Sequence, residues 1–83
     1  MELTRIMVVT NRVREFRKSS RLTQAELGRA CGVSRQSIVS VEGGDYSPSV
    51  YLALKLAGAL DSTVEDLFPL TPDDRLEPEE EST

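Results

Sequence analysis

TQAELGRACGVSRQSIVSVE, residues 23–42, predicts two short helices joined by a tight turn. Thr23 is followed three residues later by Glu26, and this spacing is typical of a capping box at the start of a helix. Gly32 can adopt the left-handed conformation that ends a helix and turns the chain. Ser34 is a preferred capping residue for the helix that follows. Two short helices joined in this way form a helix-turn-helix arrangement.

The apolar residues of the same segment are spaced to close the two helices on each other and on a later helix. They are Leu27, Cys31, Val33, Ile38 and Val41. Gly28 lies inside the first of the two helices, where glycine costs about 0.5–1 kcal/mol relative to alanine. We therefore expect a packing reason for Gly28, and close approach of the two helices supplies one.

The helix from about Ser34 to Glu42 has one face suited to reading a groove of DNA. When Ile38 and Val41 point inward, the helical period leaves these residues outward: Ser34, Arg35, Gln36, Val39 and Ser40. Arginine can donate two hydrogen bonds to guanine, glutamine can pair with adenine, and a valine methyl can pack on the thymine methyl. The alternative is that the arginine and the glutamine are ordinary solvated residues at a helix start.

Three further helices complete the pattern, so the sequence predicts an all-α fold of five helices. They are expected over residues 11–18, 49–60 and 63–68. The second of these is so rich in apolar residues that we expect it at the centre of the core. No strand pattern occurs within the core. A chain of 83 residues has room for one small domain, which we place over residues 11–70.

The composition excludes several classes of function. The chain has no His and a single Cys, whereas general bases, zinc sites and disulfides depend on these residues. We therefore expect no catalytic residue, no metal site and no cofactor, and the chain is not predicted to be an enzyme. Cys31 is expected in the core. No apolar run, residues 6–9 included, is long enough to span a membrane or to form an export signal, so we expect a cytoplasmic protein.

The charge is distributed unevenly along the chain. Residues 1–42 hold eight basic and four acidic residues, a net +4, whereas residues 43–83 hold two basic and ten acidic residues, a net −8. The two halves sum to the overall −4. Such an asymmetry suggests a basic surface for a polyanion together with an acidic tail.

The two ends of the chain lie outside the predicted domain. Residues 1–10 form an N-terminal extension, which we expect either to be disordered or to pair as a strand with a second copy. Residues 71–83 read TPDDRLEPEEEST and are predicted to be a flexible acidic tail. The tail is interpreted as a solubilising end, with a phosphate mimic that competes for the basic face as the alternative.

Residues 11–68 resemble a helix-turn-helix domain of the Xre/Cro/lambda-repressor family of DNA-binding regulators. The resemblance is most specific over LTQAELGRACGVSRQSIVSVEGGDYSPSVYLALKLAGAL, residues 22–60, and VEDLF, residues 64–68. It implies a five-helix lambda-repressor-like fold in which the third helix is the recognition helix. It also implies that Gln24 binds a DNA phosphate. The residues that it implies at base edges are Arg35, Gln36 and Ser40.

Further residues are expected at the DNA backbone. The start of a helix offers free N–H groups and a positive dipole to a phosphate, which agrees with the role of Gln24. Additional phosphate contacts are expected from Arg12, Ser34, Ser37 and the backbone N–H of Gly43. The loop after the third helix departs from the family, because glycines stand where basic or amide residues often touch phosphate.

The resemblance also implies an ion pair between Arg17 and Glu42. This pair would hold the recognition helix to the first helix. The alternative is two independent surface charges, and an exposed pair would contribute only about 0–1 kcal/mol.

Together these features predict a sequence-specific transcriptional regulator that binds double-stranded DNA through the major groove. We expect a homodimer that binds a palindromic operator with one recognition helix per subunit, as a repressor does. Leu67, Phe68 and Leu70 are expected either to complete the core or to form part of the dimer contact. The alternative is an antitoxin-like or adaptor protein whose acidic tail binds a basic protein partner.

Overall fold

The computed structural model describes residues 11–45 and 47–70, and these residues form five helices without a strand. The helices are α1 (Val13–Ser19), α2 (Gln24–Cys31), α3 (Arg35–Glu42), α4 (Val50–Ala59) and α5 (Val64–Leu67). The predicted all-α, five-helix fold is therefore confirmed. The interpretations of residues 1–10 and 71–83 lie outside the described residues.

The first helix begins two residues later than predicted, at Val13 rather than Asn11. Asn11 instead precedes the helix, because its side-chain oxygen accepts a hydrogen bond from the Val13 N–H at 3.0 Å. The Asn11 side-chain amide also donates to the Val41 carbonyl at 2.8 Å. Asn11 therefore connects the start of α1 to α3.

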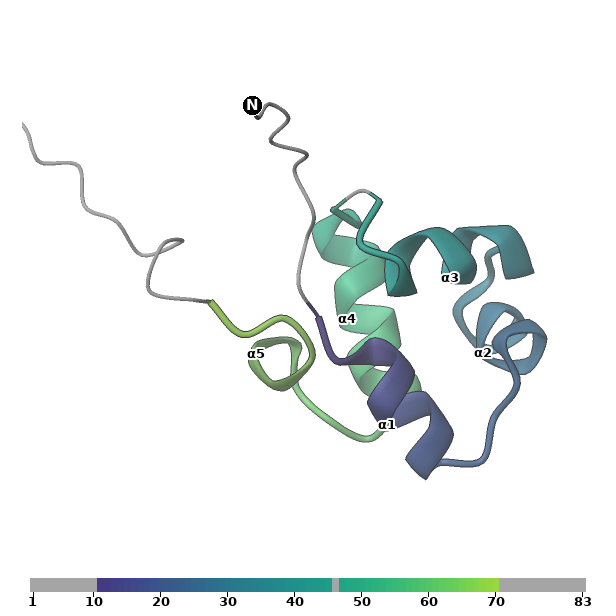
Figure 1. The fold of residues 1–83 in the computed structure, drawn as a ribbon, viewed down its shortest axis with the longest axis horizontal. Helices are drawn as coiled ribbons and strands as arrows, with labels where there is room; N and C mark the ends of the chain where they lie inside the picture. Colours follow the sequence, from purple (N-terminus) through teal and green to yellow (C-terminus); the bar gives the residue numbers. More distant parts are fainter. Residues whose placement is uncertain (1–10, 46, 71–83) are drawn as a thin grey trace, which may run out of the picture.

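The helices pack around α4, which lies behind the centre of Figure 1. α2 and α3 lie on one side of the domain and α5 on the other, with α1 in front (Figure 1). α2 packs against α3 and α4, and α5 packs against α4. A backbone hydrogen bond from the Arg12 N–H to the Leu67 carbonyl, 2.8 Å long, joins the start of α1 to the end of α5.

The turn between α2 and α3 has the predicted local structure. The Thr23 hydroxyl accepts a hydrogen bond from the Glu26 N–H at 3.0 Å, and the Glu26 carboxylate accepts one from the Thr23 N–H at 2.8 Å. Gly32 follows α2 with a φ of 73°, in the left-handed region where glycine carries no Cβ penalty. The capping box and the glycine turn are thus confirmed.

Gly28 lies where another segment packs closely against α2, as predicted. That segment is the turn after α2 rather than α3 itself. A Cβ atom at Gly28 would lie 2.9 Å from the Val33 carbonyl oxygen and 3.2 Å from that of Ser34. The Val33 N–H donates to the Gly28 carbonyl at 2.9 Å. The turn folds back onto α2 so closely that no side chain fits at this position.

The core is aliphatic and draws on every helix. Its fully buried large residues are Val13, Leu27, Cys31, Ile38, Val41, Leu56 and Leu67. Burial raises the pKa of the Cys31 thiol, so this cysteine is an unreactive core residue, as predicted. Leu67 completes the core, and Phe68 packs against it. Leu70 remains 65% exposed.

Candidate nucleic-acid interface

α3 presents its polar face to solvent at the N-terminal end of the helix. Arg35 and Gln36 are exposed, and Val39 and Ser40 are half-buried further along the helix. Ile38 and Val41 are fully buried, which fixes the rotation of α3 about its axis. The predicted base-contacting residues therefore lie on one side of α3, with the first two the more accessible.

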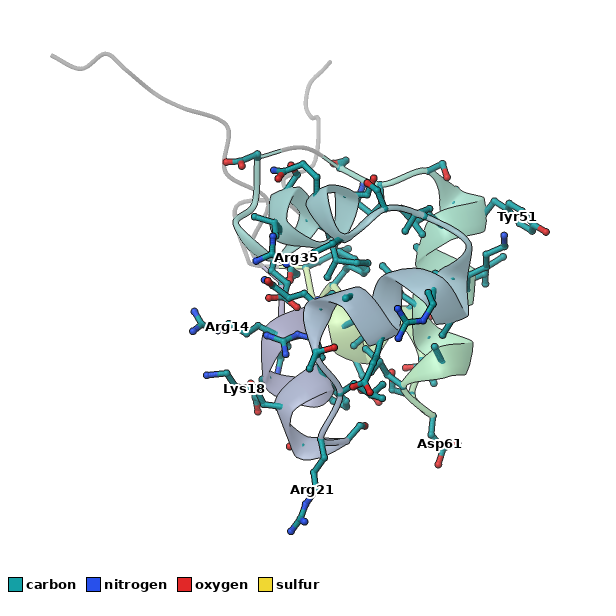
Figure 2. The ribbon with its side chains drawn as sticks, turned by 90° about the vertical axis from the view of Figure 1, so that its right-hand side faces the viewer. Arg14, Lys18, Arg21, Arg35, Tyr51 and Asp61 are labelled. Atoms are coloured by element: carbon teal, nitrogen blue, oxygen red, sulfur yellow. The ribbon has the colours of Figure 1, made fainter. Side chains whose placement is uncertain are left out.

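Two basic residues of α1 extend this surface. Figure 2 shows Arg14 and Lys18 projecting from the same side of the molecule as Arg35, away from Tyr51 on α4. Within residues 11–45 and 47–70, none of these three cations forms an ion pair with a carboxylate. We call Arg14, Lys18 and Arg35 the basic face.

Arg14 and Lys18 are candidate site residues that the sequence alone did not reveal. Their separation of four residues places them on one side of a helix, and the inward position of Val13 would have predicted which side. The packing of α1 against α3 is what brings them beside the recognition helix, and no local sequence signal encodes that packing.

A shallow hollow of about 370 Å³ lies where α1, α2 and α3 meet. Its lining residues are Arg14, Arg17, Gln24, Val39, Glu42 and Gly43. The hollow therefore brings the predicted phosphate residue Gln24 next to Val39 of the recognition helix and to the unpaired Arg14. One cation and one amide beside an accessible helix end make a suitable site for a phosphate group.

The expected ion pair between Arg17 and Glu42 is present, but it is buried rather than exposed. Their side chains are only 10% and 5% exposed. The Arg17 Nε donates to one Glu42 oxygen at 2.5 Å and a terminal nitrogen donates to the other at 3.3 Å. The second terminal nitrogen of Arg17 donates to the Leu22 carbonyl at 2.7 Å. The predicted pair is confirmed and the alternative of two independent surface charges is wrong, because this guanidinium is enclosed between α1, α3 and the start of α2.

Gln24 is held in place by the same carboxylate. Its side-chain Nε2 donates to Glu42 Oε1 at 3.1 Å. This bond occupies one of the two amide hydrogens and leaves the other for a ligand. At the start of α2 the Glu26 N–H is taken by the Thr23 hydroxyl, but the N–H groups of Gln24 and Ala25 have no acceptor within the helix. Gln24 and the start of α2 thus remain able to donate to an anion.

Ser34 and Ser37 are bonded to each other at the start of α3. The Ser34 hydroxyl accepts from the Ser37 N–H, and the two hydroxyl oxygens lie 3.1 Å apart. Ser34 is therefore the helix cap that the sequence predicted. Its role toward phosphate, and that of Ser37, stay predictions.

The structure corrects the expected phosphate contact from Gly43. Its N–H already donates to the Val39 carbonyl at 3.0 Å, and the Gly44 N–H donates to the Val41 carbonyl at 3.0 Å. Neither glycine has a free backbone donor, because the end of α3 uses both in its own cap. The loop after α3 thus lacks the donors on which that prediction depended.

Arg12 is also engaged within the molecule. Its guanidinium makes two hydrogen bonds to the Glu15 carboxylate, at 3.1 and 2.8 Å, and lies over the Phe16 ring. These bonds lower the pKa of Glu15 and raise that of Arg12. The charge of Arg12 is therefore compensated, and Arg14 is the stronger candidate for a phosphate contact.

Comparison with known proteins identifies the family. The helix-turn-helix family model matches residues 13–67, which include all five helices. The chain belongs to the Xre/lambda-repressor-like helix-turn-helix family. The resemblance found in the sequence is confirmed.

Relatives and solved structures of this helix-turn-helix family agree with the fold. A helix-turn-helix-type transcriptional regulator from Methanothermobacter thermautotrophicus is 48% identical over 62 residues, which cover 74% of this chain and 90% of the relative. The restriction-modification controller protein C.AhdI from Aeromonas hydrophila superposes with a TM-score of 0.65 and 38% identity, covering 69% of this chain and 86% of that one. The P22 c2 repressor, solved in complex with a synthetic operator, superposes with a TM-score of 0.68 and 33% identity over 70% of this chain and 88% of that one.

These relatives are regulators and not enzymes, which agrees with the prediction from composition. Among the described residues, no helix is long and apolar enough to cross a membrane. The same residues contain no group of three or more side chains that could hold a metal ion.

Proposed function

We propose that this helix-turn-helix protein is a sequence-specific DNA-binding transcriptional regulator that places α3 in the major groove. The observation that carries the proposal is the position of exposed Arg35 and Gln36 on α3 beside the unpaired cations of α1 (Figure 2). A helix that carries hydrogen-bonding side chains and is flanked by cations fits the edges of bases and the phosphates beside them.

The N-terminal half of α3 makes the base contacts in this proposal. Arg35 donates two hydrogen bonds to a guanine, and Gln36 pairs with an adenine. Val39 and Ser40 are less exposed and lie one turn further along the helix. They contribute a methyl contact to thymine and a single hydrogen bond to a base edge.

The hollow beside α3 holds a phosphate in the same proposal. Gln24 donates its remaining amide hydrogen, the start of α2 contributes its N–H groups, and Arg14 supplies charge. Lys18, one turn further along α1, contacts a neighbouring phosphate of the DNA backbone. Because the Glu42 carboxylate fixes Gln24, the amide is oriented before DNA binds.

In this proposal the regulator is a homodimer. The second copy of the chain binds at the end of the domain that carries α5. A mainly apolar groove of about 240 Å³ lies there, lined by Ser47, Pro48, Val50, Ala53, Val64 and Phe68. Val50 is 77% exposed, and Leu70 beside α5 is 65% exposed. This end lies opposite α2 (Figure 1), so a partner that covers it leaves both recognition helices accessible for a palindromic operator.

The dimer is tested by sedimentation of the full chain. Val50→Asp is expected to convert a dimer into a monomer without unfolding it, because Val50 is a surface residue. Leu54→Asp is the matched control, since Leu54 is 57% exposed on the same helix but does not line the groove. A wild-type monomer, or equal dissociation by both variants, contradicts this assignment.

A repressor role is the form of regulation that the neighbours favour. The P22 c2 protein is named a repressor and was solved on an operator, and C.AhdI is named a controller protein. A small domain of this kind represses when its operator overlaps a promoter. Such a role places the protein with the chromosome in the cytoplasm.

The proposed function is tested by selecting bound sites from a random duplex library with the full chain, followed by titration of the selected duplex and a scrambled one at several salt concentrations. A two-fold-symmetric consensus with a large preference over the scrambled duplex supports the proposal, and its half-site spacing gives the dimer geometry. Weak binding without a consensus contradicts it. That result would favour the alternative of an adaptor that binds a basic protein.

A further inference from the structure

We propose that the acidic residues 71–83 bind the basic face of their own chain and compete there with DNA. This inference rests on the proposed function for its consequence, but the contact itself can be tested without DNA. The occupant is a segment of this chain that follows the last described residue, Leu70.

Charge complementarity is the first argument. The segment carries six carboxylates against one arginine. Its acidic residues are Asp73, Asp74, Glu77, Glu79, Glu80 and Glu81. On the domain, Arg14, Lys18 and Arg35 have no carboxylate partner among the described residues, whereas Arg12 and Arg17 are each paired with a glutamate. The basic face therefore lacks the type of partner that the segment supplies.

The point where the segment leaves the domain is the second argument. The Leu67 carbonyl accepts a hydrogen bond from the Arg12 N–H, so the end of α5 lies beside the start of α1 (Figure 1). Arg14 follows two residues later, and Lys18 lies one turn beyond it on the same side. The segment therefore begins only three residues after Leu67, whose carbonyl is bonded to the start of the helix that carries Arg14 and Lys18.

The length of the segment is sufficient for this contact. Thirteen residues extend to roughly 43 Å at about 3.3 Å per residue, whereas α1, with seven residues, is only about 10 Å long. A short tether also keeps the carboxylates near the face at an effective concentration on the order of millimolar. Individually weak contacts are then enough for substantial occupancy.

The consequence for DNA binding follows from competition for one surface. A segment that covers the basic face lowers the affinity for cognate and random DNA by the same factor, because either duplex must displace the segment before it binds. Salt screens the contact between the segment and the face. The competition is therefore strongest at low salt and disappears at high salt.

The contact is tested first without DNA, in a full-length variant in which the six carboxylates of the segment become amides: Asp73→Asn, Asp74→Asn, Glu77→Gln, Glu79→Gln, Glu80→Gln and Glu81→Gln. Nuclear magnetic resonance spectra of this variant and of the wild-type chain are compared. We expect shifts at Arg14, Lys18 and Arg35 in about 10 mM salt that vanish in about 1 M salt. Asp61→Asn is the control, because Asp61 is an exposed acid that Figure 2 shows on the side away from Arg14.

An absence of shifts at the three cations overturns the proposal, and so do shifts that persist in high salt. Titration with random duplex DNA then tests the consequence, and we expect the amide variant to bind several-fold more tightly at low salt only. Tighter binding without shifts in the free protein would mean that the segment only repels DNA, which also overturns the proposal. Shifts in a protein that binds no DNA would support the contact and contradict the proposed function.

Discussion

Arg17 of α1 and Glu42 of α3 form a buried ion pair whose carboxylate also accepts a hydrogen bond from Gln24 of α2. One glutamate therefore joins three helices at the edge of the candidate DNA surface. Because Gln24 is the predicted phosphate ligand, the pair orients a contact residue as well as the recognition helix. Stability and binding are coupled at this point.

Removing one partner of this pair is expected to be costly. Glu42→Ala leaves the Arg17 guanidinium buried without its counter-charge, so we expect the free energy of unfolding to fall by about 3–5 kcal/mol. Urea denaturation followed by circular dichroism measures this loss. The double variant Arg17→Met/Glu42→Met should recover most of it, since apolar residues of similar volume replace such pairs well.

Glu15→Ala is the matched control for this prediction. Its pair with Arg12 is exposed, with 46% and 60% of the two side chains accessible, so we expect a far smaller loss than for Glu42→Ala. Equal losses in Glu15→Ala and Glu42→Ala would show that the burial of the Arg17 pair has no energetic effect.

Two glycines inside helices are expected to respond to alanine in opposite directions. Gly28→Ala places a Cβ 2.9 Å from the Val33 carbonyl oxygen, so the turn must move and we expect a loss of about 1–3 kcal/mol. Gly58→Ala meets no atom within 4 Å and should stabilise the protein by up to about 1 kcal/mol. Thermal unfolding of both variants measures the difference. A stabilising Gly28→Ala would disprove the close approach.

The capping box predicts a contribution to acid sensitivity. Hydrogen bonds from Thr23 lower the pKa of Glu26 in the folded protein. The stabilisation is thus present above the unfolded pKa of glutamate, about 4.3, and is lost as pH falls through the lower folded value. Glu26→Gln keeps a capping side chain but cannot titrate. Its free energy of unfolding should fall less steeply below that pH than the wild-type value, whereas parallel curves would contradict the assignment.

Most of the helix boundaries could be predicted from the sequence because their signals are local. Thr23 with Glu26 starts α2, Gly32 ends it and Ser34 starts α3, and each acts within a few residues of its own position. The start of α1 was predicted two residues early, because the Asn11 side chain accepts from the Val13 N–H and also bonds to Val41, thirty residues away.

The candidate site was harder to predict where it depends on packing. The position of Arg14 beside Gln24 and the burial of Arg17 both follow from how α1 lies on α3. The Gly43 N–H donates to the Val39 carbonyl in the cap of α3. No short-range sequence pattern indicates these arrangements. The sequence therefore predicted which residues belong to the site better than it predicted their bonding partners.

The central claim is that α3 distinguishes bases while α1 holds the DNA backbone, and comparing Arg35→Ala with Arg14→Ala tests it most directly. Each variant is titrated against the duplex selected by the wild-type chain and against a scrambled duplex. Arg35→Ala should lose about 1–3 kcal/mol on the selected duplex and far less on the scrambled one. Arg14→Ala should weaken binding to both duplexes alike. It should also reduce the slope of log affinity against log salt concentration by about one, which corresponds to the loss of one phosphate contact. Equal losses on the two duplexes for Arg35→Ala would contradict the claim that α3 reads the sequence.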